Sequence, residues 1–137
     1  MSVISELIRT EADGTISFGN YELDAKAKKS DFEHDGDLYK VKTFKEITKL
    51  ERNGMFVYES VPGTVVSNMK AADGNLSFVV EGTTDTQVAV ELEESTGYQV
   101  FIDEKAIGEM KTNLGGKLIL SVELENDKKV AVRIEKA

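Results

Sequence analysis

The chain has 137 residues, of which 40% are hydrophobic and 31% are charged, values that are ordinary for one soluble globular domain and unlike those of a disordered chain. The formal net charge of −8 argues against a general affinity for nucleic acid or an anionic membrane, because both are polyanions that require clustered Lys and Arg. The chain has no cysteine, which excludes disulfides, thiolate zinc sites and a cysteine nucleophile.

The first residues allow two interpretations. Residues 3–9 form either one short helix or an opening strand, because four apolar side chains fall on one helical side: Val3, Ile4, Leu7 and Ile8. The start of the chain has no apolar run of signal-peptide length, and no later segment approaches about 18 consecutive apolar residues. We therefore expect a cytoplasmic protein, unless a native leader has been removed.

The next segment is predicted to be mostly extended. Residues 15–18 and 21–23 have the character of strands, and Asp31–Asp37 is predicted to be a polar, acidic loop. Residues 38–44 alternate in a way that predicts a strand with one basic face. A local basic cluster precedes the acidic loop, and we interpret it as a solvated strand face: Lys26, Lys28 and Lys29.

Residues 44–52 are ambiguous between a helix and a strand. Thr43 and Glu46 have the spacing of a capping box, and apolar residues recur at helical intervals, which predicts a helix. However, Asn53-Gly54 is the preferred type I′ turn pair and residues 55–58 are strong strand formers, which predicts a hairpin. The hairpin is favoured, since the neighbouring elements are strands.

The only proline precedes a long run of short strands. Proline at position i+1 and glycine at i+2 predict a type II turn at Pro62-Gly63, and a boundary between residues 1–61 and residues 62–137. Seven alternating segments follow, with turn signals about every ten residues: residues 64–69, 75–81, 86–92, 97–102, 106–112, 117–124 and 129–135. The pattern predicts an all-β, immunoglobulin-like antiparallel β-sandwich over residues 62–137. Residues 1–61 are expected to be a β-rich N-terminal segment that packs on the sandwich or completes a second sheet.

Two of these strands allow sharper predictions. In the segment 117–124, the even-numbered apolar residues from Leu118 to Leu124 should share the buried face, with Ile119 pointing the other way. Tyr98 alternates with apolar residues and is expected in the core. The segment Lys129–Glu135 has no proline and few charges to protect an exposed edge. If it is an edge strand, it can pair with the same strand of a second molecule and form a two-fold homodimer.

Three stretches carry hairpin and alternation patterns that resemble those of a known kind of domain: NLSFVVEG, VAVELEESTGYQVFIDEKAIGEMKTNLGGKLILSVEL and KVAVRIEK. They are similar to the small immunoglobulin-like β-sandwich accessory domains of bacterial polysaccharide-degrading enzymes, and the similarity covers roughly residues 74–135. More faintly, the whole chain resembles a family of short uncharacterised bacterial proteins that are sometimes labelled endosialidase. The first resemblance implies a carbohydrate-associated accessory module, and its motif includes no catalytic residue.

Carboxylates alternate along the acidic loop. Asp31, Glu33 and Asp35 supply hard oxygen donors at positions 1, 3 and 5, with Gly36 at position 6, which makes them candidate calcium ligands. An EF-hand is excluded, because its twelfth position is Lys42 where a bidentate glutamate is needed. The alternative is a solvated acidic turn.

Signals for catalysis are few. His34 is the only histidine, which excludes a paired-histidine mechanism, and the chain has no Gly-x-Ser-x-Gly elbow around a nucleophilic serine. Sequence alone does not place two of the 25 acidic residues across a cleft, as a glycosidase would require.

Aromatic residues for ligand binding are also few. The chain has no tryptophan, and Tyr39 and Tyr58 are the candidate residues for a ligand-binding surface. We expect a non-enzymatic binding or scaffold protein without a cofactor, acting on protein through a sheet face or an edge strand. A carbohydrate-associated module is the alternative, and a small hydrolase is a more distant one.

Overall fold

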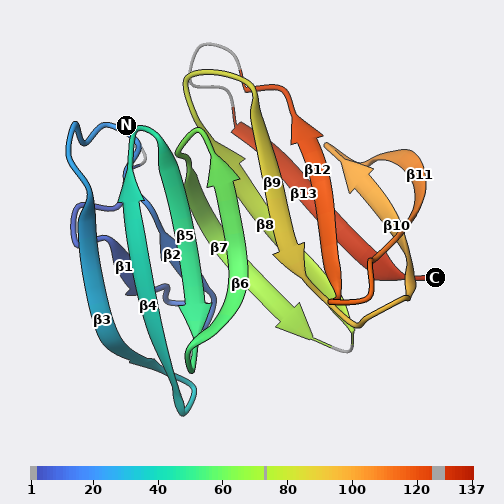
Figure 1. Cartoon of the computed structure of the whole chain (residues 1–137), viewed down its shortest axis with the longest axis horizontal. Coiled ribbons are helices and arrows are strands. Elements are labelled where there is room, and N and C mark those ends of the chain that lie inside the picture. The colour runs from blue at the N-terminus through green and yellow to red at the C-terminus, as the bar shows by residue number, and fades with distance from the viewer. Residues whose placement is uncertain (1–2, 73, 125–128) are drawn as a thin grey trace.

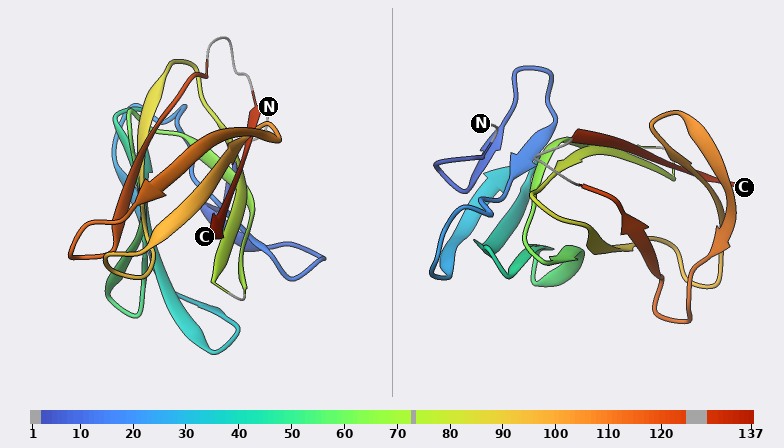
Figure 2. Two further views of the ribbon diagram at one scale, coloured as in Figure 1. Left: turned by 90° about the vertical axis from the view of Figure 1, so that its right-hand side faces the viewer. Right: turned by 90° about the horizontal axis from the view of Figure 1, so that it is seen from above.

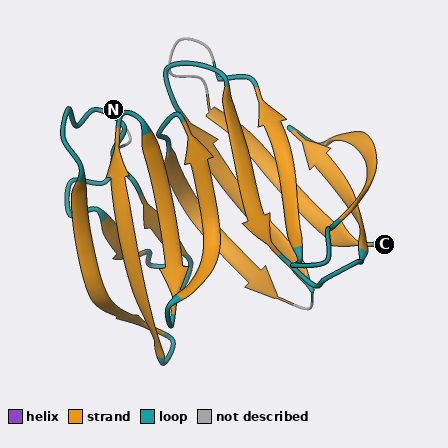
Figure 3. Ribbon diagram, in the orientation of Figure 1, coloured by secondary structure: helices purple, strands orange, loops and turns teal. Residues whose placement is uncertain are grey.

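The computed structural model describes residues 3–72, 74–124 and 129–137, and in these ranges the chain forms strands and no helix (Figures 1 and 3). The strands are β1 (Ile8–Thr10), β2 (Ile16–Phe18), β3 (Ala27–His34), β4 (Asp37–Phe44), β5 (Ile47–Arg52), β6 (Met55–Val61), β7 (Val65–Ala72), β8 (Asn75–Glu81), β9 (Thr86–Glu91), β10 (Gly97–Ile102), β11 (Lys105–Lys111), β12 (Lys117–Val122) and β13 (Lys129–Lys136). The described ranges therefore contain no helix that is long and apolar enough to cross a membrane.

Two antiparallel sheets pack face to face as a sandwich (Figures 1 and 2). The seven-stranded sheet has the order β1-β2-β7-β8-β13-β10-β11, and the six-stranded sheet has the order β12-β9-β6-β5-β4-β3. The predicted all-β sandwich with a β-rich N-terminal segment is confirmed. That segment does more than cover the sandwich, because β3 to β6 supply four strands of the second sheet while only β9 and β12 of it come from residues beyond 61.

The core follows the predicted alternation. Leu118, Leu120, Val122 and Leu124 are all buried, whereas Ile119 between them is 52% exposed, so the predicted register of β12 is confirmed. Tyr98 is buried as predicted. Phe18 of the seven-stranded sheet meets Tyr58 of the six-stranded sheet edge to face, with ring centroids 5.3 Å apart, which locks the two layers together.

Residues 47–61 form the favoured hairpin and not a helix. β5 and β6 pair on either side of Asn53 and Gly54, whose φ angles are 53° and 80°. A type I′ turn requires positive φ at both central residues, so the Asn-Gly pair explains the hairpin. At the start of the chain, residues 3–7 lie outside any helix or strand, and only the end of the segment 3–9 is extended, since β1 begins at Ile8. Residues 21–23, expected to be extended, lie outside any strand.

The prediction of an acidic loop over residues 31–37 is wrong. β3 runs through to His34, and Asp35 and Gly36, with φ angles of 51° and 82°, make a two-residue turn into β4. Charged side chains are tolerated along β3 because it is the edge strand of its sheet and is exposed over most of its length.

The predicted type II turn at Pro62-Gly63 is also wrong. The Val61–Pro62 bond is cis, and Gly63 does not have the positive φ that a type II turn requires. Glycine is needed there for a different reason: an added Cβ would overlap the carbonyl oxygen of Phe44. The Gly63 N–H donates to the carbonyl of Lys45 at 3.0 Å, which holds the two connections together.

The condition set for the homodimer, an edge position for Lys129–Glu135, is not met. β13 pairs with β8 on one side and β10 on the other, so its main-chain groups are already engaged. The last strand could not be recognised as central from its own residues, because a short alternating segment with few charges suits both positions. The edges are β1 and β11 in one sheet and β3 and β12 in the other. Edge-to-edge pairing of β13 with the same strand of a second molecule is therefore excluded.

Candidate functional site

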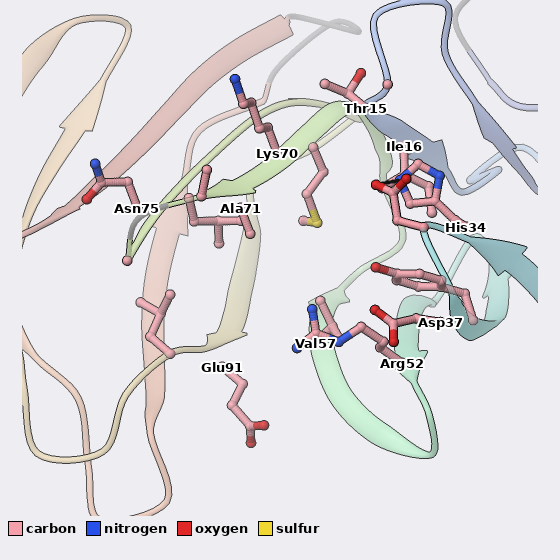
Figure 4. Close-up of a pocket in the computed structure, with 18 of the residues that line it drawn as sticks. Thr15, Ile16, His34, Asp37, Arg52, Val57, Lys70, Ala71, Asn75 and Glu91 are labelled. Atoms are coloured by element: carbon pink, nitrogen blue, oxygen red, sulfur yellow. Dashed lines mark ion pairs between the residues drawn. The ribbon is translucent and has the colours of Figure 1, made fainter.

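The two sheets enclose a cleft of about 690 Å³ at one end of the sandwich (Figure 4). We call this end the open end. Its lining comes from the β1–β2, β3–β4, β5–β6 and β7–β8 turns and from the segment that joins β9 to β10. Connections held at the end of a rigid sheet pair are common positions for binding residues. The volume falls within the range of small-molecule sites, roughly 300–1,000 Å³.

The inner wall of the cleft is apolar and continuous with the core. Met69, Leu76 and Tyr98 come from the seven-stranded sheet and are buried, and Val57 and Leu92 pack against the same core. The backbone N–H of Glu93 donates to the Tyr98 hydroxyl at 3.1 Å, so this tyrosine is fixed in place. A ligand entering the cleft would therefore meet a preformed surface.

Charged groups surround the mouth. Arg52 and Asp37 lie next to each other on one wall of the cleft, and Asn75 lies on the opposite wall (Figure 4). Glu91 lies at the end of β9, on a third wall. Within the part of the chain that the structure describes, neither Arg52 nor Glu91 forms an ion pair. A guanidinium offers several fixed donors, and a carboxylate accepts from hydroxyl or ammonium groups. The mouth can therefore bind a ligand that has both donors and acceptors.

His34 joins the edges of the two sheets beside the cleft. Its Nδ1 lies 2.9 Å from the Thr10 hydroxyl of β1, and its Nε2 lies 3.4 Å from an Asp35 carboxylate oxygen. The Tyr39 ring meets the imidazole edge to face at 5.9 Å. Hydroxyl, imidazole and carboxylate stand in the order of a hydrolytic triad. However, the Asp35 side chain is 84% exposed, so water competes for it and its hold on the imidazole is weak.

The structure does not gather the three predicted calcium ligands. Asp31, Glu33 and Asp35 follow one another along the β3 edge and its turn, and among the described residues no three His, Cys, Asp or Glu side chains are placed to share a metal ion. Asp31 sits at a break in the β3–β4 register with a φ of 58°.

The two predicted surface tyrosines have different positions. Tyr39 is only 9% exposed but lines the cleft. Tyr58 is fully buried, so its placement on a ligand surface is wrong: its ring stands between Phe18 and Phe78 in the core. Alternation does place a strand tyrosine on one face or the other, but it does not say which face is buried.

Polar side chains also meet at the opposite end of the sandwich, which we call the closed end. The Thr64 hydroxyl lies 2.9 Å from the Tyr58 hydroxyl and 2.7 Å from that of Ser60, and all three side chains are fully buried. Thr48 donates to the Thr64 carbonyl at 2.8 Å and contacts the Thr43 hydroxyl at 2.8 Å. Burial raises the pKa of Tyr58 to about 12. This hydroxyl network carries no sequence signature, because threonine and serine suit exposed strands equally well.

The sequence also gives little notice of Arg52 and Glu91. Each is a charged residue at the end of a strand, which is an ordinary solubilising position. They line one cleft only because β5 and β9 run in the same direction in the six-stranded sheet, each being antiparallel to β6 between them. To predict that Arg52 and Glu91 line the same cleft, one would need the order of the strands in the sheet, which the sequence does not give.

No family model matches the chain, and no curated protein or solved structure shows significant similarity to it. What the protein does must therefore be inferred from its own residues.

Proposed function

We propose that the chain is a non-enzymatic binding module that holds a small polar ligand in the cleft of the open end. The observation that carries this proposal is the combination of a preformed apolar wall with two charged residues at the mouth, Arg52 and Glu91, that form no ion pair with any described residue. A concave, mostly apolar site with a few convergent polar groups is the usual form of a small-molecule site.

A saccharide is the ligand class that we favour. Asp37 and Glu91 can accept from sugar hydroxyls, Arg52 and Asn75 can donate to them, and the apolar wall can cover the less polar face of a sugar ring. The resemblance of residues 74–135 to carbohydrate-associated accessory domains points the same way. We also propose that the module is immunoglobulin-like in its layers, because it has two antiparallel sheets packed face to face.

Amide chemical shifts test the proposal directly. ¹⁵N-labelled protein is titrated with neutral, N-acetylated and uronic disaccharides. We expect one class to shift amides at the four turns of the open end and to leave the closed end unchanged. Arg52→Ala and Glu91→Gln should each weaken binding about tenfold, the value of one charge-assisted hydrogen bond. Lys105→Gln, on β11 and outside the cleft, is the matched control.

Shifts confined to an outer sheet face, or unchanged affinity in both cleft variants, would refute the cleft as the site. Failure of every disaccharide would refute the saccharide as the ligand class. Release of hydrolysis products during the titration would refute the non-enzymatic assignment.

A small hydrolase is the second candidate, and the contact between Thr10 and His34 favours it. In that role His34 would take the hydroxyl proton and Thr10 would attack an ester. Turnover of p-nitrophenyl acetate that is lost in Thr10→Val and retained in Thr10→Ser would support it. Equal background rates in wild type and Thr10→Val would eliminate it.

A further inference from the structure

Three lysines stand directly opposite one another on the outer face of the six-stranded sheet. Lys28 of β3 is paired in register with Lys42 of β4, and Lys42 is paired with Lys49 of β5. Lys40 lies two residues along β4 and therefore on the same face. We call these four residues the lysine row. Neighbouring strands are about 4.8 Å apart, so the three aligned positions span about 9.6 Å.

The lysine row forms few ion pairs. Lys49 lies 3.5 Å from Glu51, but Lys28, Lys40 and Lys42 form no ion pair with any described residue. Like charges directly opposite on neighbouring strands are destabilising. The chain has 25 acidic residues against 17 basic ones, so acidic partners for these lysines are not in short supply. Glu51 and Glu59 are paired in register with Lys40 and Lys49, whereas Lys28 and Lys42 have no acidic residue opposite them on a neighbouring strand. The uncompensated part of the row, Lys28 and Lys42, is therefore a candidate contact surface for an anionic partner.

Apolar side chains continue this face at one end of the row. Phe44 follows Lys42 along β4 and is paired in register with Ile47 of β5, and both are partly buried. Val61 of β6 is 54% exposed. A highly charged polymer would gain little from such neighbours, whereas a protein segment with acidic and apolar side chains could use both.

We propose that the lysine row binds the acidic face of an α-helix on a partner protein. Residues i, i+4 and i+7 share one helix face and span about 10.5 Å, close to the span of the three aligned lysines. An extended peptide laid across the strands presents same-face side chains only about every 6.8 Å, and a nucleic-acid strand presents a phosphate about every 3.4 Å. The helix gives the better match, and its other residues can reach Phe44 and Val61.

Two peptides with identical composition test the spacing. Both have about 20 residues, enough for a helix, and are rich in alanine. One carries its glutamates at i, i+4, i+7 and i+11, and the other carries the same number spread evenly around the helix. Binding of the fluorescein-labelled peptides is followed by anisotropy at about 50 mM and about 300 mM salt, since screening weakens exposed charge contacts.

We expect the one-faced peptide to bind wild type more tightly than the spread peptide does, and more tightly at low salt. Lys42→Gln, which removes the central lysine, should weaken binding about fivefold, the value of one exposed charge pair. Lys105→Gln, on the edge strand of the other sheet, should bind as wild type does. The Lys42→Gln protein should not melt at a lower temperature, because the substitution relieves like-charge repulsion.

Four outcomes would overturn the proposal. Equal binding of both peptides would indicate general attraction to anions, and an equal loss in Lys105→Gln would place the contact elsewhere. Association with phosphatidylserine vesicles that needs Lys42, without binding of either peptide, would identify a membrane surface instead. Absence of binding at low salt would leave the row without this function.

Discussion

The two ends of the sandwich bring polar side chains from both sheets together but treat them in opposite ways. At the closed end, the hydroxyls of Tyr58, Ser60 and Thr64 satisfy one another in full burial. At the open end, Arg52 and Glu91 line the cleft and form no ion pair with any residue in the described ranges. Buried polar groups are costly unless they are paired, whereas solvated ones are free to bind. The closed end therefore stabilises the fold, and the open end is available for a ligand.

The largest expected effect is at the closed end. Thr64→Val removes the hydroxyl that contacts both Tyr58 and Ser60, so two buried hydroxyls each lose a hydrogen-bond partner. The free energy of unfolding should fall by about 2–3 kcal/mol. Urea denaturation measures the loss. Thr84→Val, at an exposed position, is the control and should change stability by less than about 0.5 kcal/mol. A loss below about 1 kcal/mol for Thr64→Val would mean that the network does not hold the closed end together.

The second effect is a loss of stability in alkali that originates at the closed end. Burial raises the pKa of Tyr58 from 10.0 to about 12, so the unfolded chain releases this proton first and stability falls as pH rises from 10 to 12. The loss should be on the order of 2 kcal/mol at the top of this range. Chemical denaturation at stepped pH measures it. Tyr58→Phe lacks the group and should show a shallower decline, and an equal decline in both proteins would contradict the assignment.

A smaller loss of stability is expected at the contact between Thr10 and His34, which joins the edges of the two sheets beside the cleft. Thr10→Val removes the hydroxyl that meets His34 across the two sheets, at a partly solvated position, and should cost about 0.5–1 kcal/mol. Thr10→Ser retains the hydroxyl and should recover most of the loss. If Thr10→Val is as stable as wild type, or if Thr10→Ser is destabilised as much as Thr10→Val, the hydrogen bond to His34 does not hold this edge.

The smallest change in stability is expected at the open end, and it gives the sharpest test of the difference between the two ends. Arg52→Ala and Glu91→Gln remove charges from the mouth of the cleft and should change the free energy of unfolding by less than about 0.5 kcal/mol each. Thermal and urea melts of the variants measure this. A loss above about 1 kcal/mol for either would show that the residue supports the fold, and would weaken its assignment to a ligand.

Most strands can be predicted from the sequence, except the end of β3 at residues 31–34, but the order of the strands in the sheets cannot. Asn53-Gly54 identifies its hairpin and alternation places Leu120 in the core, because both signals depend on residues close together in the chain. The cleft depends on which strands become neighbours, and nothing local to Arg52 or Glu91 records that. The central position of β13 was missed for the same reason. Lys26, Lys28 and Lys29 do not form the single strand face that their clustering predicts, because Lys26 precedes β3 and the consecutive residues Lys28 and Lys29 lie on opposite faces of the sheet. Only the register of β3, β4 and β5 shows three lysines in one line.

The position of β13 also determines when the seven-stranded sheet can close. β8 and β10 do not pair with each other, since β13 lies between them and is made after both. A ribosome releases strands in chain order, so the β7–β8 and β10–β11 hairpins must wait with facing edges unpaired until residues 129–136 emerge. Unpaired edges are where nascent chains join each other. The risk of association through this sheet is therefore greatest during synthesis and ends when its central strand is inserted.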